Sequence, residues 1–429
     1  MSRSILNKTR YFLRKIERFG SFHLLGTNFF INFLGFGSQL LIAKFISPID
    51  LGRIKTMQSF VAVAVIAAGF GLNTAILKLC SEKRPLDEKK RILKDNLNIT
   101  AAVSILTVTL IGLLSFLHWL SPDLAINEFM LAFMWIIPPT ALTMGLICYL
   151  QALKKIKLMA KSQVLIRLFG VAFLVIATYY WKILGFIVAT IIIRWVALVP
   201  LLWLARIKWD FQTKLTPLTR LSLGYGKWSM ASNGMNALRK YLDLFILNYF
   251  LLNRSLLGDY GLAAILILAL DQVTLTVQNI ATPYFSEKSQ DPLAFKQALS
   301  KYQRLLIATA FILTGGAVLI GPKFISFIYQ DKYPLTGVFF QILTLRYFFG
   351  SCQALLGIAL ITLGRIKDNF IISCIALPVT IGFSIWFIRL WGPFGAAWAQ
   401  VAGAFISMII FHFKSKKIIH DAFATPSHY

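Results

Sequence analysis

Long apolar stretches separated by short polar connections make up most of this chain. Each stretch has about 20 residues or more, which as an α-helix spans the ~30 Å hydrocarbon core of a bilayer. We predict twelve such spans, at residues 22–45, 57–79, 97–120, 128–153, 162–181, 183–205, 228–251, 258–283, 303–326, 335–361, 369–390 and 393–413. Pro138 and Pro139 lie inside the fourth span, where they predict either a hinge or a static kink.

The two halves of this pattern repeat each other at a nearly constant offset. The matching landmarks are Gly52 with Gly258, Ser81-Glu82-Lys83 with Ser286-Glu287-Lys288, Lys155-Ile156-Lys157 with Arg365-Ile366-Lys367, and Trp181, Gly185 and Ala189 with Trp391, Gly395 and Ala399. Six spans per half is an even number, so the halves are expected to be parallel repeats. A transporter built in this way binds its substrate between the halves and alternates by moving one against the other.

Composition and charge agree with a membrane protein. The 429 residues are 57% hydrophobic and only 14% charged, whereas about a quarter of a soluble domain is charged. The net charge of +27 reflects topology, because 30 of the 44 lysines and arginines lie in connections on the side of the N-terminus and 8 on the other side. The positive-inside rule therefore predicts that both termini are cytoplasmic. Nucleic acid is not an expected partner.

This topology predicts five parts. They are a basic amphipathic segment at 1–21, an N-terminal six-helix lobe at 22–205, a cytoplasmic linker at 206–227, a C-terminal six-helix lobe at 228–413 and a cytoplasmic tail at 414–429. The first segment fits a helix lying on an anionic cytoplasmic leaflet.

The stretch from Lys227 to Leu251 carries polar residues through a predicted span. Those residues, which include Ser229, Asn233, Asn236, Arg239, Lys240 and Asp243, recur at steps of three and four and share one helix face. A charge facing lipid at mid-bilayer costs at least ~2.5 kcal/mol, so we expect this face to line a cavity. The first span offers a second stripe of Asn28, Asn32 and Gln39, although hydrogen bonding between packed helices explains Asn28 and Asn32 as well.

Cations outnumber carboxylates within the spans. This excess predicts an anionic substrate, and guanidinium groups suit phosphate or carboxylate oxygens. The predicted substrate-binding residues are Arg239, Lys240, Arg346, Arg194, Arg167 and Lys78, together with Asn28, Asn32, Gln39, Asn233 and Asn236. Lys78 and Arg167 lie nearer the cytoplasmic ends of their spans, where snorkelling to the interface is the competing interpretation.

The two carboxylates within spans, Asp243 and Asp271, are the candidates for ion coupling. Asp243 follows Arg239 by four residues, so an intrahelical ion pair is its simplest explanation. Asp271 has no cation within one turn of its own span, and it could exchange a proton or bind a cation such as sodium during transport. A structural ion pair with Arg346 or Arg194 on another helix is the alternative.

Other chemistry finds little support in the sequence. Four single cysteines and five scattered histidines form neither a disulfide framework nor a metal-ligand spacing, and no cofactor is expected. There is no GxxxxGK[ST] phosphate-binding loop. A membrane polymerase or glycosyltransferase would need a large external loop or paired carboxylates. The close external pair, Asp123 and Glu128, is explained better by a solvated turn.

Four motifs point to a family. They are FISPIDLGRIKTMQSF (45–60), GFGLNTAILKLCSE (69–82), LLGDYGLAAIL (256–266) and GPFGAAWAQVAGAF (392–405). With the twelve spans, they resemble bacterial polysaccharide flippases of the Wzx O-antigen type, in the multidrug/oligosaccharidyl-lipid/polysaccharide exporter (MOP) superfamily. Ser47, Ile49 and Arg53 depart from the family's usual residues in the first motif, which we place in an external turn.

The resemblance implies a MATE-like fold and the transfer of an undecaprenyl-pyrophosphate-linked oligosaccharide across the bacterial inner membrane, for O-antigen or exopolysaccharide biosynthesis. Membrane lipids, a polysaccharide polymerase and a chain-length regulator would be its partners. A multidrug or cation antiporter of the same superfamily is the main alternative, although it would call for unpaired carboxylates in the cavity. Flippases of the lipid-linked peptidoglycan precursor also have a cationic cavity, but we expect fourteen spans for them.

Overall fold

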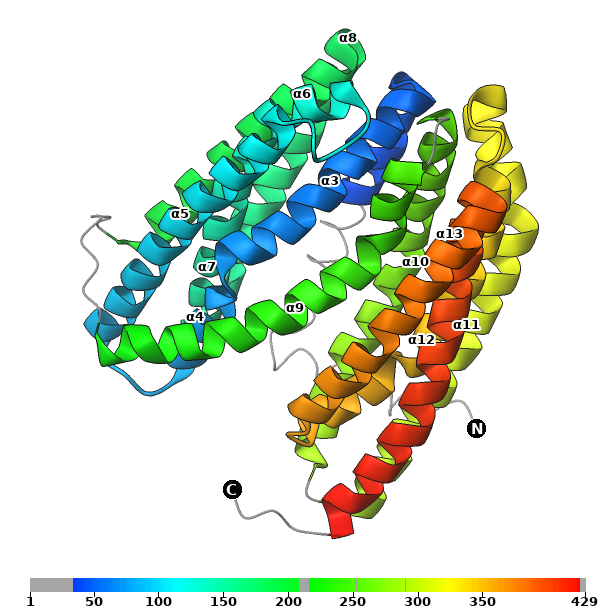
Figure 1. Cartoon of the computed structure of the whole chain (residues 1–429). Coiled ribbons are helices and arrows are strands. Elements are labelled where there is room, and N and C mark those ends of the chain that lie inside the picture. The colour runs from blue at the N-terminus through cyan, green and yellow to red at the C-terminus, as the bar shows by residue number, and fades with distance from the viewer. Residues whose placement is uncertain (1–33, 208–215, 251–253, 290, 425–429) are drawn as a thin grey trace, which may run out of the picture. The chain divides into compact units, whose positions relative to one another are not determined.

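The computed structural model describes residues 34–207, 216–250, 254–289 and 291–424, and every regular element in these ranges is helical (Figure 1). A first helix covers residues 34–45. It is followed by α3 (Pro48–Gly69), α4 (Leu72–Ser81), α5 (Leu86–Phe116), α6 (Leu124–Phe133), η1 (Met134–Ile136), α7 (Ile137–Ala152), α8 (Ile156–Ala205), α9 (Pro217–Phe250), α10 (Arg254–Glu287), α11 (Pro292–Tyr329), η2 (Gln330–Lys332), α12 (Thr336–Thr362) and α13 (Ile366–Ala424). The predicted all-α fold class is confirmed. Asn28 and Asn32 lie outside the described residues.

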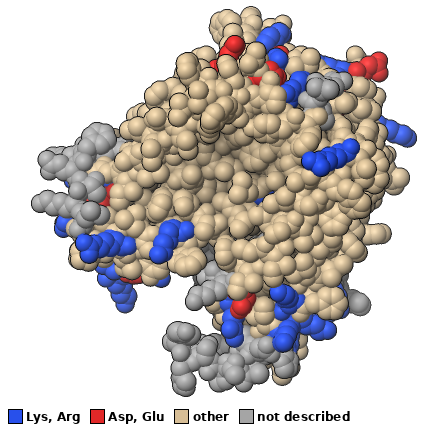
Figure 2. Space-filling model, in the orientation of Figure 1, with Lys and Arg blue, Asp and Glu red and all other residues tan. Residues whose placement is uncertain are grey.

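The helices present an apolar surface to their surroundings. Large side chains such as Leu106 and Phe327 are 69% and 84% exposed. On the face shown in Figure 2, charged side chains lie mainly near the margins and leave a broad uncharged area between them. Eight described segments are long and apolar enough to cross a bilayer. A surface of this kind is stable against lipid rather than water, so the chain is a multi-pass membrane protein; the count of twelve spans stays a prediction.

The two longest helices, α8 and α13, each contain a reversal of the chain. Lys182 in α8 has φ 51° and ψ −129°, and Gly392 in α13 has φ 56° and ψ −130°. Beyond each reversal, a Cβ atom built on Gly185 or Gly395 would overlap the backbone carbonyl of the residue eight positions earlier. Residues eight apart in a continuous helix are about 12 Å from each other. Each element is therefore a helical hairpin, and the predicted breaks at these two positions are confirmed.

The same backbone geometry shows that the repeat in the sequence is a repeat in the structure. The two reversals are 210 residues apart, as are Lys154 and Gly364, which both take positive φ after α7 and α12. The matching glycines at the start of α3 and α10 touch one another. A Cβ on Gly52 would lie 3.0 Å from the Gly258 nitrogen, and a Cβ on Gly258 would overlap the Pro48 carbonyl.

The motif predicted to form an external turn is helical instead. Ser47 accepts a hydrogen bond from the Asp50 backbone N–H at 3.1 Å and donates to the Asp50 carboxylate at 2.9 Å. With Pro48 at the first helical position, this is a capping box. Helix α3 therefore begins nine residues before the predicted span and stops at Phe70 and Gly71, which have positive φ. The external turn expected at Ser47, Ile49 and Arg53 was wrong, because Ser47 caps a helix that begins at Pro48.

Two further boundaries differ from the predictions. A 3₁₀ turn, η1, interrupts the fourth span just before Pro138, so this span is broken where the proline pair begins; whether it acts as a hinge stays a prediction. Helix α9 begins at Pro217, eleven residues before the predicted span, and the Thr216 hydroxyl accepts from the Thr219 backbone N–H at 3.3 Å. Much of the predicted linker at 206–227 is thus helical.

The described residues form two compact units. The first unit contains residues up to 38, 68–107 and 135–229, and the second contains 39–67, 108–134 and 230 onward. The second unit therefore joins most of the predicted C-terminal lobe to two segments of the predicted N-terminal lobe. The core of the first unit is built around Leu93, Leu146 and Tyr149, and a core of the second around Phe285 and Leu355. The lobe boundaries stay predictions.

Candidate functional site

A cavity of about 560 Å³ lies within the second unit, lined by α9, α10, α12 and α13. Its charged lining residues among those described are three cations, Arg239, Lys240 and Arg346, and one carboxylate, Asp271. The polar lining is otherwise uncharged and consists of amides and hydroxyls: Asn236, Gln272, Gln278, Gln353, Asn369, Gln400, Thr274, Thr380, Ser351 and Ser407. The cavity is therefore polar, with a net positive charge.

Helix α9 brings its polar stripe to this cavity. Asn236, Arg239 and Lys240 fall within one turn of each other and all line it, as the helical spacing predicted. The Arg239 guanidinium donates to the Ser407 hydroxyl at 3.4 Å, and that hydroxyl donates to the Gln353 side-chain oxygen at 2.8 Å. Lys240 is exposed. Asn233 is exposed on the same helix but is not among the residues that line the cavity.

Asp243 does not form the predicted ion pair with Arg239. Its side chain is only 7% exposed and accepts a hydrogen bond from the Tyr260 hydroxyl of α10, while Arg239 is directed to Ser407. The i,i+4 spacing allowed the pair, but the rotation of α9 in the bundle buries Asp243 against α10 instead. Asp243 is therefore separated from the cavity lining.

Asp271 has a partner on another helix, as the alternative interpretation held. Its carboxylate lies 3.4 Å from Nη1 of Arg346, and both side chains are between a quarter and a third exposed. The pair belongs to a series of polar contacts that join α10 to α12. Other members are Thr274 with Ser351 at 2.8 Å and Gln278 with the Ala354 carbonyl at 3.0 Å. These contacts fix the register of the two helices and so hold Arg346 at the cavity.

Lys55 is a buried cation in α3, at a position between the first two predicted spans. It is 8% exposed, and its ammonium donates to the side-chain oxygens of Gln39 at 2.7 Å and Gln58 at 3.0 Å. The capping box at Ser47 was the signal that could have placed Lys55 within a helix.

The remaining predicted cations belong to the first unit. Lys78 is exposed and donates to the Tyr225 hydroxyl at 2.6 Å. Arg167 is half-buried, with its guanidinium packed so closely on Gly35 that a Cβ there would overlap it, and its Nε atom has no hydrogen-bond partner among the described residues. Arg194 is exposed and is close enough to Arg167 for the two to repel each other. Neither arginine forms an ion pair within the described residues.

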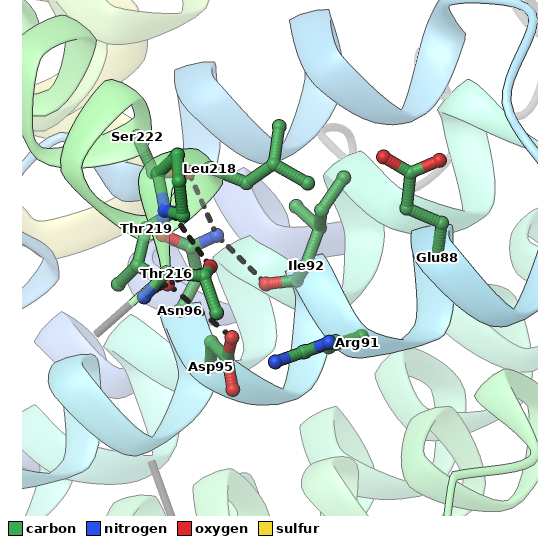
Figure 3. Close-up of a pocket in the computed structure, with 10 residues that line it drawn as sticks. Glu88, Arg91, Ile92, Asp95, Asn96, Thr216, Leu218, Thr219 and Ser222 are labelled. Carbon is green, nitrogen blue, oxygen red and sulfur yellow. Dashed lines mark hydrogen bonds between the residues drawn. The ribbon is translucent and has the colours of Figure 1, made fainter. Parts of the chain in front are cut away.

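A second cavity, of about 430 Å³, lies in the first unit between the N-terminal turns of α5 and α9 (Figure 3). Asn96 donates to the Ile92 carbonyl at 2.7 Å and to the Ser222 hydroxyl at 3.2 Å, and Thr219 donates to Asp95 at 3.3 Å. Its charged lining among the described residues consists of Glu88, Arg91 and Asp95. With two carboxylates to one cation, this lining does not suit an anion. We interpret these contacts as fastening α9 to α5.

The sequence predicted that Asp123 lies in a solvated turn, but the structure buries most of its side chain. Its side chain is only 10% exposed, and it caps α6 by accepting from the Ala125 backbone N–H at 3.1 Å. It also forms ion pairs with Arg53, at 2.9 Å, and with Arg254, at 3.7 Å. Asp123 is a structural residue that ties α3 and α10 to the start of α6.

Within the described part of the chain, no group of three His, Cys, Asp or Glu side chains is arranged to hold a metal ion. The residues that line the main cavity can bind a ligand by charge attraction and by hydrogen bonding.

Comparison with known proteins gives matches in sequence and in fold. The polysaccharide biosynthesis protein family matches over residues 19–289, more than half of the chain. The amylovoran biosynthesis protein AmsL of Erwinia amylovora is 28% identical over 212 residues, which cover 48% of this chain and 53% of AmsL. The chain thus spans about half the length of this relative.

Among solved structures, the chain is similar to the lipid II flippase MurJ in an inward closed conformation, with a TM-score of 0.74, 17% identity, and coverage of 94% of this chain and 90% of MurJ. It is also similar to an inward-facing multidrug resistance transporter of the MATE family, with a TM-score of 0.72, 12% identity, and coverage of 92% of this chain and 96% of that one. At these identities the likeness shows the fold alone, and the predicted MATE-like fold is confirmed. The match in sequence shows the family, and the chain belongs to the polysaccharide biosynthesis protein family.

Proposed function

We propose that this protein moves an undecaprenyl-pyrophosphate-linked oligosaccharide across the bacterial inner membrane by alternating access, for O-antigen or exopolysaccharide biosynthesis. The observation that carries the proposal is the charge of the main cavity, where Arg239, Lys240 and Arg346 line the wall with Asp271 as the one carboxylate among the described lining residues. Membership of the polysaccharide biosynthesis family and the fold shared with a lipid II flippase support the same cargo class. The protein acts as a transporter and not as an enzyme.

The pyrophosphate is the part of the cargo that suits these cations. Its oxygens accept hydrogen bonds from guanidinium groups in pairs, and contacts of this charge-assisted kind are about twice as strong as neutral ones. Arg239 is held ready by Ser407 and Gln353, which reduces the conformational freedom lost on binding. The Arg346 guanidinium lies on the same wall, 3.4 Å from the Asp271 carboxylate of α10. Lys240 is exposed and supplies a charge without fixed geometry.

The uncharged polar lining suits the oligosaccharide. Amide groups such as Gln278, Gln353 and Asn369 both donate and accept hydrogen bonds, which matches the hydroxyl groups of sugars. The first-half cations Arg167 and Arg194 are kept as further candidates for contact with the cargo, because neither has a carboxylate partner among the described residues.

A multidrug or cation antiporter would share this fold, so the fold does not distinguish it. The charge of the cavity does, because a cationic drug would meet three cations and a carboxylate that is already paired. Coupling to a proton or sodium ion is proposed at Asp271 rather than at Asp243, because Asp243 is buried against Tyr260 and away from the cavity lining.

Removal of a cavity cation tests the proposed function. In cells whose chromosomal copy is deleted, Arg239→Ala should lower surface polysaccharide, because the loss of one charge-assisted hydrogen bond weakens binding by about 10- to 100-fold. Lys414→Ala is the matched control, since Lys414 is an exposed cation in the last part of α13. Export by the two variants that is equal at matched membrane expression would contradict the proposal.

The proposed location is the inner membrane with both termini in the cytoplasm. Cysteine labelling of intact cells tests this topology at two positions. Trp181→Cys, at the exposed tip of the α8 hairpin, should react with a reagent that does not cross the membrane, whereas Ser289→Cys, between α10 and α11, should react only after permeabilisation. Labelling of both from the same side would refute the topology.

A further inference from the structure

The ion pair between Arg346 and Asp271 differs from the pair between Arg53 and Asp123 in the same unit. Arg53 and Asp123 meet through two nitrogen–oxygen contacts, at 2.9 and 3.4 Å, and the Asp123 side chain is 10% exposed. Arg346 and Asp271 meet through one contact of 3.4 Å, and their side chains are 28% and 30% exposed. Both also line the main cavity. The pair is thus accessible to a ligand and is held by a single contact.

Asp271 is the only carboxylate on the described wall of a cavity with three cations, so it is the natural counter-charge for the empty cavity. A pyrophosphate bound at Arg346 would bring its negative charge close to this carboxylate. The two anions repel each other and compete for the same guanidinium nitrogens. The ligand has more oxygens and more charge to offer, and it forms the bidentate contact that Asp271 does not make.

We propose that Asp271 is an internal counter-anion that occupies Arg346 when the cavity is empty and that the cargo's pyrophosphate displaces. This inference rests on the proposed function, because it takes the pyrophosphate as the competing group. It adds a role for the carboxylate: Asp271 weakens cargo binding and stabilises the empty protein. An empty carrier must change conformation to bind again, and Asp271 reduces the repulsion among Arg239, Lys240 and Arg346 during that step.

The competing interpretation is that Asp271 only positions Arg346. It predicts the opposite sign for the effect of neutralising the carboxylate. A positioning residue improves the geometry of the guanidinium, so its loss weakens anion binding. A counter-anion competes with the ligand, so its loss strengthens anion binding.

The test measures the affinity of the purified full-length protein in detergent for geranylgeranyl diphosphate, a shorter probe that carries a pyrophosphate on a prenyl chain, with a free terminal phosphate in place of the sugar. Asp271→Asn, which keeps the shape and removes the charge, should bind the probe about two- to fivefold more tightly than the wild type, the range expected for a partly exposed ion pair. Asp271→Glu, which restores the charge, should return the affinity to within about twofold of the wild type. Asp331→Asn, at an exposed carboxylate in η2 outside the cavity lining, is the matched control and should leave the affinity unchanged.

A second measurement follows lipid transfer in reconstituted vesicles, where Asp271→Asn should turn over more slowly than the wild type because the empty form returns less readily. Weaker or unchanged probe binding by Asp271→Asn, with binding by the wild type intact, overturns this inference and leaves the proposed function in place. Absence of probe binding by the wild type and by Asp271→Asn overturns both. Tighter binding cannot result from misfolding, so the expected result is informative about the site.

Discussion

The two halves of the chain carry residues of opposite charge at one equivalent position of the repeat, and each of these residues contacts the start of a helix. Arg53 and Asp259 each follow the matching glycine, Gly52 or Gly258, by one residue, so they occupy equivalent positions of the repeat. In the first half, Arg53 pairs with Asp123, the residue that caps α6. In the second half, Asp259 itself accepts hydrogen bonds from the backbone N–H groups of Leu335 at 3.1 Å and Thr336 at 3.0 Å, at the start of α12.

Both halves of the repeat place a negative charge at the start of a helix. A carboxylate stands at the N-terminus of a helix in both halves, where unpaired backbone N–H groups and the helix dipole favour negative charge. In one half the capped helix supplies that carboxylate, and in the other a neighbouring helix does. The repeat therefore preserves backbone position and the charge required at a helix end, while the residue that provides the charge has changed.

The largest effect is expected where the two halves touch. Gly258→Ala would push a methyl group into the Pro48 carbonyl, and because the obstacle is backbone it cannot rotate away. We expect a loss of about 3 kcal/mol or more in the free energy of unfolding, measured by thermal unfolding in detergent. Gly316→Ala, at a helical glycine with open space around its Cβ, is the matched control and should be neutral or slightly stabilising. Equal stability of the Gly258→Ala variant would refute the close contact.

A charge exchange sharpens the comparison between Arg53 and Asp259. Arg53→Asp alone places a second carboxylate beside Asp123 and should cost about 2 kcal/mol in the free energy of unfolding, because a partly buried ion pair is replaced by repulsion. Adding Asp123→Leu gives the first half a carboxylate at position 53 and a leucine at the start of α6, as the second half has Asp259 and, at the start of α12, Leu335.

The double variant should then be more stable than the sum of the two single variants by about 1 kcal/mol, as a double-mutant cycle measures. Strict additivity of the two changes would show that the positions are not equivalent.

A smaller effect is expected at the two hairpins. Lys182 and Gly392 share φ near 50° to 56° and ψ near −130°, a conformation that favours glycine. Lys182→Gly should therefore stabilise the protein by about 1 kcal/mol, and Gly392→Ala should destabilise it by a similar amount. Thermal unfolding of the two variants provides the measurement. A destabilising Lys182→Gly would mean that the exposed lysine has a role that outweighs its backbone strain.

Part of the cavity could be predicted from the sequence. The i, i+3, i+4 spacing of Asn236, Arg239 and Lys240 predicted a shared face, and the structure places these three on the cavity wall. The same spacing failed for Asp243, because the partner that buries it, Tyr260, lies on another helix. The spacing of residues in one helix shows which of them share a face. It does not show which other helix packs against each side of that face.

Boundaries were predicted less well than spans. Hydropathy located the breaks in α8 and α13 because a reversal interrupts an apolar run, but it placed the starts of α3 and α9 too late. The first turns of these two helices are polar, so a hydropathy profile does not detect them. The Ser47-Pro48-Ile49-Asp50 capping box would have extended α3 and, with it, would have moved Lys55 into a helix.

The sequence by itself determined the membrane class, the repeat and the excess of cations within apolar segments, because each follows from which residues the chain contains and how they are spaced. Only the tertiary structure decided which charges meet. Arg346 reaches Asp271, Arg53 reaches Asp123, and Lys55 reaches two amide oxygens. These pairings depend on the rotation and register of packed helices, which are set by side-chain contacts between segments far apart in the chain.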